Sequence, residues 1–120
     1  MLASTGVHEY SLVGALLERV EAEARVHDAT AVRRIRLAVG RLAGVEAELL
    51  RWAFEQLREG TVCANAELEI ADVEVRWECP ESGRVLDATS ELKCPDCGAS
   101  GRLVSGDELT LETLELEVAD

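Results

Sequence analysis

The sequence predicts an α+β fold, in which two helices pack on a three-stranded sheet and a small cysteine-rich lobe is inserted into the chain. Apolar residues recur at helical spacing in two segments and alternate with polar residues in three others. The segment 75–105, before the last alternating run, holds both prolines and three of the four cysteines. Packing helices on one sheet face buries the apolar side of each such element. The predicted units are an α+β domain of residues 1–74 plus 106–120 and an inserted lobe of residues 75–105.

The net charge limits the classes of partner. The 120 residues include 24 acidic and 12 basic side chains, giving a formal charge of −12, and aromatic residues make up only 3%. Such a chain has no basic stripe to bind phosphates and few rings on which bases could stack, so no nucleic-acid partner is expected. No apolar run approaches the roughly 18 residues of a transmembrane helix, and no signal-peptide pattern opens the chain. We therefore expect a cytoplasmic protein with no membrane contact.

Two amphipathic helices are predicted. The first should run from Ser11, whose hydroxyl suits an N-cap, to about His27, because its apolar residues fall on one face. The second should cover residues 45–58, where the helical pattern is clearest. Gly60 is well placed to end it.

Three strands are predicted from alternation. Residues 33–40 alternate apolar and polar positions, as in a strand with one buried face. Segments 66–75 and 108–118 also alternate, but in both the apolar period slips by one residue midway. Such a slip predicts a bulge in each strand or a matched twist. The polar positions of both segments are strongly acidic and are expected to face water.

Two cysteine motifs lie in the lobe. Cys94-Pro95-Asp96-Cys97-Gly98 has the form of a zinc knuckle, in which two cysteines separated by two residues point at one ion. Cys79-Pro80-Glu81-Ser82-Gly83 has the same outline, with Ser82 in place of the second cysteine. A hydroxyl loses its proton far less readily than a thiol, whose free pKa is about 8.5, so Ser82 is a poor zinc ligand. The motifs predict a zinc-ribbon-like lobe with structural zinc on Cys79, Cys94 and Cys97.

The fourth zinc donor stays open at this point, with water, Glu81, Asp96 and Cys63 as candidates. A second interpretation is a lobe that folds loosely without metal. A third is a thioredoxin-like redox pair at Cys94 and Cys97, which would open a helix. The residues after Cys97 favour a turn instead, so this interpretation ranks last. Cys63 is predicted to be a small buried apolar residue.

Four segments in the same order resemble the HypA family, the nickel chaperones that mature nickel-iron hydrogenases and in some bacteria support urease. The segments are His8-Glu9-Tyr10-Ser11-Leu12, the stretch Gly40 to Glu46, the stretch Phe54 to Ile70, and the cysteine-rich insertion closed by Ser105-Gly106-Asp107-Glu108-Leu109. The resemblance implies an α+β nickel-binding domain with an inserted zinc ribbon. It agrees with the fold expected from the patterns above.

The resemblance also implies a function and its residues. Family members bind Ni(II) through an N-terminal histidine imidazole, the terminal amine and nearby backbone amides, donors that suit this ion. By this resemblance His8 and Glu9 are the nickel residues, and Glu46 lies near them. The implied partners are a HypB-type GTPase, the hydrogenase large subunit and urease maturation proteins. No phosphate loop or activated nucleophile is recognisable, so no enzymatic activity is expected.

Two departures from the family pattern leave a competing hypothesis. Ser82 breaks one of the two cysteine pairs of the family zinc site, and six residues precede Val7. A GTG codon read as a start at position 7 would restore the family opening Met-His-Glu, and we expect this start. The first hypothesis is therefore a nickel metallochaperone with a structural zinc lobe. The alternative is a degenerate family member that serves as a non-enzymatic protein adaptor without strong nickel binding.

Overall fold

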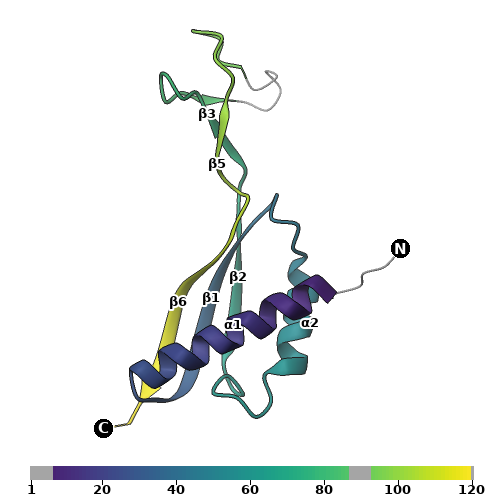
Figure 1. The fold of residues 1–120 in the computed structure, drawn as a ribbon, viewed down its shortest axis with the longest axis vertical. Coiled ribbons are helices and arrows are strands. Elements are labelled where there is room, and N and C mark those ends of the chain that lie inside the picture. Colours follow the sequence, from purple (N-terminus) through teal and green to yellow (C-terminus); the bar gives the residue numbers. More distant parts are fainter. Residues whose placement is uncertain (1–6, 87–92, 120) are drawn as a thin grey trace.

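A computed structural model of the chain describes residues 7–86 and 93–119. These residues form two helices and two three-stranded sheets, with strand orders β2-β1-β6 and β4-β3-β5. Figure 1 shows both helices beside the sheet β2-β1-β6. The sheet β4-β3-β5 lies beyond the end of that sheet at which β2 leads to β3. The elements are α1 (Val7–Val26), β1 (Ala29–Gly40), α2 (Ala47–Leu57), β2 (Glu67–Val73), β3 (Arg76–Glu78), β4 (Val85–Leu86), β5 (Arg102–Ser105) and β6 (Leu109–Val118). The α+β class predicted from the sequence is confirmed.

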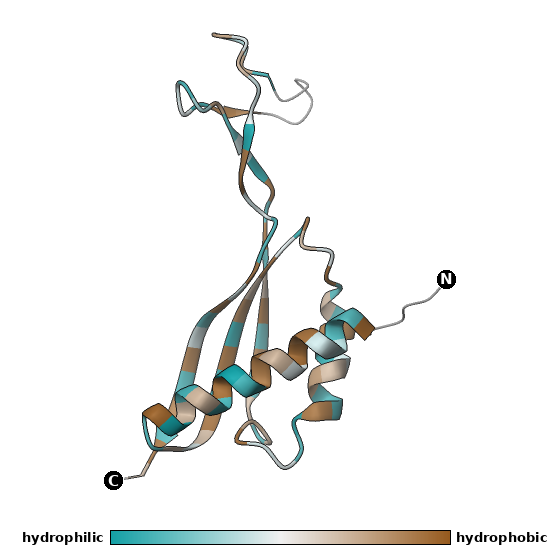
Figure 2. Ribbon diagram, viewed as in Figure 1, coloured by the Kyte–Doolittle hydropathy of each residue, from teal (hydrophilic) through white to brown (hydrophobic). Residues whose placement is uncertain are grey.

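The main core lies between the helices and β1. β1 is the central strand, parallel to β2 and antiparallel to β6, with Ile35 opposite both Leu68 and Leu114. Its alternate residues Ile35, Leu37 and Val39 are buried against the two helices, together with Val13, Leu17, Val20, Leu50, Ala53 and Phe54. Figure 2 shows apolar and polar residues alternating along these strands. Within the described residues, no helix is long and apolar enough to cross a membrane.

The first helix begins earlier than predicted. α1 starts at Val7, so Ser11 lies inside the helix and the predicted N-cap is wrong. The buried residues of α1 include Glu9 as well as Val13, Leu17, Val20 and Ala24. Glu9 continues this face by one turn because its carboxylate has a hydrogen-bond partner, whereas a pattern of apolar residues cannot include a glutamate.

The first strand also begins earlier, at Ala29. Asp28 adopts the left-handed conformation, with a φ of 53°, and turns the chain from α1 directly into β1. Its N–H donates to the carbonyl of Arg25 over 3.2 Å, which closes the helix. Aspartate tolerates this backbone conformation better than most residues do.

The two predicted bulges have different outcomes. The pairing of β6 with β1 shifts between Thr113 and Leu111, leaving Glu112 as the extra residue, so the bulge in β6 is confirmed. β2 pairs with β1 without a shift from Glu67 to Val73, so of the two predicted alternatives, a bulge or a matched twist, the bulge is wrong for β2. β2 lies at the sheet edge and is half-buried on both faces over residues 68–71, which lets its apolar period slip without a bulge.

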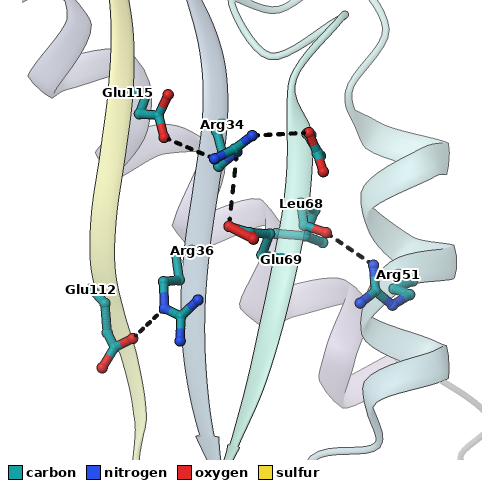
Figure 3. Close-up of polar contacts among 8 residues, drawn as sticks. Arg34, Arg36, Arg51, Leu68, Glu69, Glu112 and Glu115 are labelled. Carbon is teal, nitrogen blue, oxygen red and sulfur yellow. Dashed lines mark hydrogen bonds and ion pairs between the residues drawn. The ribbon is translucent and has the colours of Figure 1, made fainter.

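Ion pairs cross the sheet face that lies opposite the helices. The guanidinium of Arg34 on β1 contacts Glu67 and Glu69 on β2 at 3.5 and 3.8 Å, and Glu115 on β6 at 3.3 Å. Arg36 donates to Glu112 on β6 over 2.9 Å. Figure 3 shows both arginines between the carboxylates of the flanking strands. The acidic strand positions are therefore partly neutralised by the central strand.

Backbone hydrogen bonds join the end of β1 to the segment that leads into β6. The Gly40 N–H donates to the carbonyl of Glu108 over 2.8 Å, and the Leu42 N–H donates to that of Gly106 over 2.6 Å. A Cβ atom on Gly40 would lie 2.2 Å from the backbone of Gly106, closer than real contacts allow. Glycine is therefore required at position 40, where β1 ends beside the start of β6.

We expect Arg34→Ala to destabilise the fold by about 1 kcal/mol, because it leaves three carboxylates close together without their shared cation. The melting temperature should fall by a few degrees, and high salt should recover part of the loss. Thermal melts at low and high ionic strength measure both. Arg33→Ala is the control, because Arg33 is exposed and has no ion pair among the described residues. Equal losses in the two variants would contradict this role for Arg34.

Candidate metal centres

Three cysteines of the lobe form one cluster. The sulfur atoms of Cys79, Cys94 and Cys97 all lie within 4.8 Å of one another, and those of Cys79 and Cys97 are 3.5 Å apart. Sulfurs bound to one tetrahedral zinc are about 3.8 Å apart, so the spacing fits a shared ion. Cys79 and Cys94 are buried, whereas Cys97 is exposed. Within the described residues, no other group of three His, Cys, Asp or Glu residues is close enough to hold a metal.

Two turns with the same backbone hydrogen bonds hold these cysteines. In the first turn, the N–H of Cys79 donates to Arg84 over 2.9 Å and the N–H of Gly83 donates to Cys79 over 2.8 Å. In the second turn, the N–H groups of Cys94 and Gly98 make the equivalent bonds, also at 2.9 and 2.8 Å. Gly83 and Gly98 have φ values of 75° and 73°, which glycine adopts without strain. The two motifs read from the sequence therefore fold as matched turns.

Ser82 occupies the same place in its turn as Cys97 does in the other. Its hydroxyl oxygen lies 4.0 Å from the sulfur of Cys94, across the cluster, just as Cys97 lies across from Cys79. The Ser82 N–H donates to the sulfur of Cys79 over 3.4 Å. The hydroxyl and the backbone N–H of Ser82 together lower the pKa of the Cys79 thiol to about 6. The turn thus favours a thiolate at Cys79, the form that binds a metal.

None of the protein donors considered for the fourth position joins the cluster. Asp96 accepts a hydrogen bond from the guanidinium of Arg84 over 2.8 Å. Glu81 is exposed and lies outside the group of sulfurs. Cys63 is fully buried in the main core, as predicted, and burial raises its thiol pKa to about 11. The residues after Cys97 form a turn and a bridge to Lys93 rather than a helix, which disfavours a thioredoxin-like pair.

The predicted nickel residues lie in the first turn of α1. His8 is exposed, whereas Glu9 has only 5% of its surface exposed. The Glu46 N–H donates to Oε2 of Glu9 over 3.0 Å, and Glu46 directly precedes α2. The side chain of Glu46 makes no capping bond, and the carboxylate of Glu9 instead brings a hydrogen-bond acceptor to this helix start. His8 and Glu9 are not brought together with a third ligand among the described residues, and residues 1–6 lie outside that range.

The spacing of Glu9 is compatible with this burial but does not predict it. Glu9 precedes Val13 by four residues and therefore lies on the same helix face as the buried side chains. Its partner is 37 residues away in the chain, and no local pattern identifies such a pair.

The fold and the cysteine cluster define a small α+β metal-binding protein with a zinc-ribbon-like lobe. Residues 7–116 match the sequence model of the family described as "Hydrogenase/urease nickel incorporation, metallochaperone, hypA". The chain belongs to the HypA family, as its resemblance to that family predicted. The family assignment favours the metallochaperone hypothesis over the adaptor.

Curated relatives and solved structures agree with this assignment. The hydrogenase maturation factors HypA of Aquifex aeolicus and Helicobacter hepaticus are 36% and 34% identical, over 93% of this chain and 99% and 98% of theirs. The solution structure of the Ni metallochaperone HypA from Helicobacter pylori is 30% identical, with a TM-score of 0.71 over 92% of this chain and 98% of that one. A second HypA solution structure gives a TM-score of 0.77 at 30% identity over 93% and 98%.

Proposed function

We propose that this chain is a nickel metallochaperone of hydrogenase maturation, which binds Ni(II) at the N-terminal end of α1 and carries structural zinc in its cysteine lobe. The observation that carries the proposal is the family match over residues 7–116, which opens on the segment containing His8 and Glu9. Two relatives support this role by name. The Aquifex aeolicus protein is a hydrogenase maturation factor HypA, and the Helicobacter pylori protein is a Ni metallochaperone HypA. Delivery to urease maturation is proposed on the family description alone.

His8 is the proposed nickel-binding side chain. Its imidazole is exposed in the first turn of α1, so it can bind and release an ion without unfolding the helix. Nitrogen donors in one plane suit Ni(II), and a terminal amine, which titrates at about 7.7–8, can lose its proton to join them. A site with few ligands at a chain end has the modest affinity that suits a carrier.

Glu9 is proposed to position this site. Its Oε2 is bonded to the Glu46 N–H, which fixes the first turn of α1 beside the start of α2. Glu46 is proposed to contribute through its backbone N–H, a role that the family resemblance alone could not specify.

The lobe is proposed as a separate unit of residues 75–105 that is held together by zinc. The buried part of its described core consists of Cys79, Leu86 and Cys94, with Trp77 and Ala99 packed against it. So small an apolar core contributes little to stability, whereas zinc binding by thiolates supplies folding free energy directly. The unit joins the main sheet where β2 leads to β3 and β5 leads to β6.

The proposed partners are a HypB-type GTPase, the hydrogenase large subunit and urease maturation proteins. Their support is the family description, which names nickel incorporation into hydrogenase and urease. The proposed role is to carry and transfer the ion, with no chemical step performed on a substrate.

Removal of zinc by a strong chelator should unfold the lobe and leave the main sheet intact. Limited trypsin digestion should then cut after Arg84 and Arg102, while the main-core residues keep their protection from hydrogen exchange. The reason is that the lobe loses the folding free energy supplied by zinc binding, which its small apolar core cannot replace. Resistance of both arginines to trypsin after complete zinc removal would contradict a metal-dependent lobe.

Titration with Ni(II) by calorimetry tests the carrier role. One form starts at Met1 as printed, and the other starts with methionine in place of Val7. We expect one-to-one binding with the short form, which pairs a free amine with His8 at the family spacing, and at least tenfold weaker binding with the long form.

His8→Ala in the short form should abolish this binding, whereas the control His27→Ala should not change it, because His27 lies at the opposite end of α1. Equal binding by both forms would show that the terminal amine is not a ligand. The absence of binding in either form would contradict the carrier role.

A further inference from the structure

We infer that the cysteine lobe holds its metal with three protein thiolates and leaves the fourth position open to a thiol from outside the chain. The position is the one that Ser82 faces. This inference rests on the proposed metal binding by the lobe. It goes beyond that proposal because a purely structural zinc site is closed by four protein ligands.

The backbone around Ser82 is already arranged for a fourth sulfur. The turn 79–84 and the turn 94–99 make the same two hydrogen bonds at the same lengths, and each has a left-handed glycine after its second ligand position. Cys97 lies across the cluster from Cys79, and Ser82 lies across from Cys94. Ser82 differs from Cys97 of the matching turn in the atom bonded to Cβ, which is oxygen in place of sulfur. The Ser82 side chain therefore points toward the fourth metal position but brings no sulfur to it.

The hydroxyl of Ser82 does not replace that sulfur. It accepts a hydrogen bond from the backbone N–H of Arg84 over 3.3 Å, which holds the hydroxyl within its own turn. A serine hydroxyl is also neutral at physiological pH and is not among the usual zinc donors, which are cysteine, histidine and carboxylate groups. Among residues 7–86 and 93–119, the protein donors considered for this position are engaged elsewhere or lie outside the cluster, as described for Asp96, Glu81 and Cys63.

The open corner faces solvent. Ser82 and Cys97 are both exposed, whereas Cys79 and Cys94 on the other side of the cluster are buried. A small molecule or a protruding side chain can therefore reach the fourth position without unfolding the lobe.

A thiol is the class of ligand that fits this position best. Three thiolates make a soft donor set, and the corner is shaped by a turn whose twin holds a sulfur. An incoming thiol releases its proton to solvent as its sulfur binds, and no group changes oxidation state. Both a free metabolite thiol and a cysteine of another protein provide this chemistry.

Loading the metal-free chain with Co(II), which reports its ligands by absorption, tests the inference. The starting complex should show three thiolate ligands per cobalt. Addition of reduced glutathione, or of a blocked peptide containing one cysteine, should raise the thiolate-to-metal absorption by about one third, the change from three to four sulfurs. A response to glutathione alone points to a metabolite thiol, and a response to the peptide points to a protein cysteine.

Two variants at position 82 sharpen the test. Ser82→Cys should show four thiolates at the start and no response to added thiol. Ser82→Ala should match the parent chain in both its starting spectrum and its response. A changed starting spectrum in Ser82→Ala, or no response of the parent to either thiol, would overturn the inference. Failure of Co(II) to bind the lobe at all would instead refute the proposed metal site itself.

Discussion

The pairing of β1 with strands from two distant parts of the chain is the constraint on which the rest of the structure depends. β2 runs parallel to β1 and β6 runs antiparallel to it. The end of β2 and the start of β6 must therefore lie at the same end of the sheet, beside Gly40. All residues between those strands have to leave and return at that end, which is why the cysteine segment forms a lobe there rather than a layer over the core (Figure 1).

The same central strand reduces the electrostatic repulsion among the acidic side chains of its neighbours. Glutamates on β2 and β6 lie on the open sheet face, where they would repel one another across the strands. Arg34 on β1 is shared by carboxylates of both neighbouring strands, and Arg36 pairs with Glu112 on β6. This arrangement makes an acidic surface compatible with a closely paired sheet.

The sequence predicted the elements with strong periodicity and missed the features that depend on distant contacts. The second helix, the central strand, the bulge at Glu112 and the burial of Cys63 all follow from local pattern or residue type. The additional first turn of α1 does not follow from a local pattern. Its buried residue, Glu9, is hydrogen-bonded to the backbone N–H of Glu46, which is distant in the sequence. The spacing of the cysteines predicted their cluster, whereas the equivalence of the two turns and the bond between Arg84 and Ser82 required the folded backbone.

The loop 41–46 is held at both of its ends. Near its start, the Leu42 N–H bonds to Gly106 at the base of the lobe, and at its end the Glu46 N–H bonds to Glu9. The segment therefore acts as a spacer of fixed length between the cysteine lobe and the proposed nickel region. An inserted or deleted residue would have to break one of these bonds. Variation among natural sequences should consequently change the side chains of this loop far more often than its length.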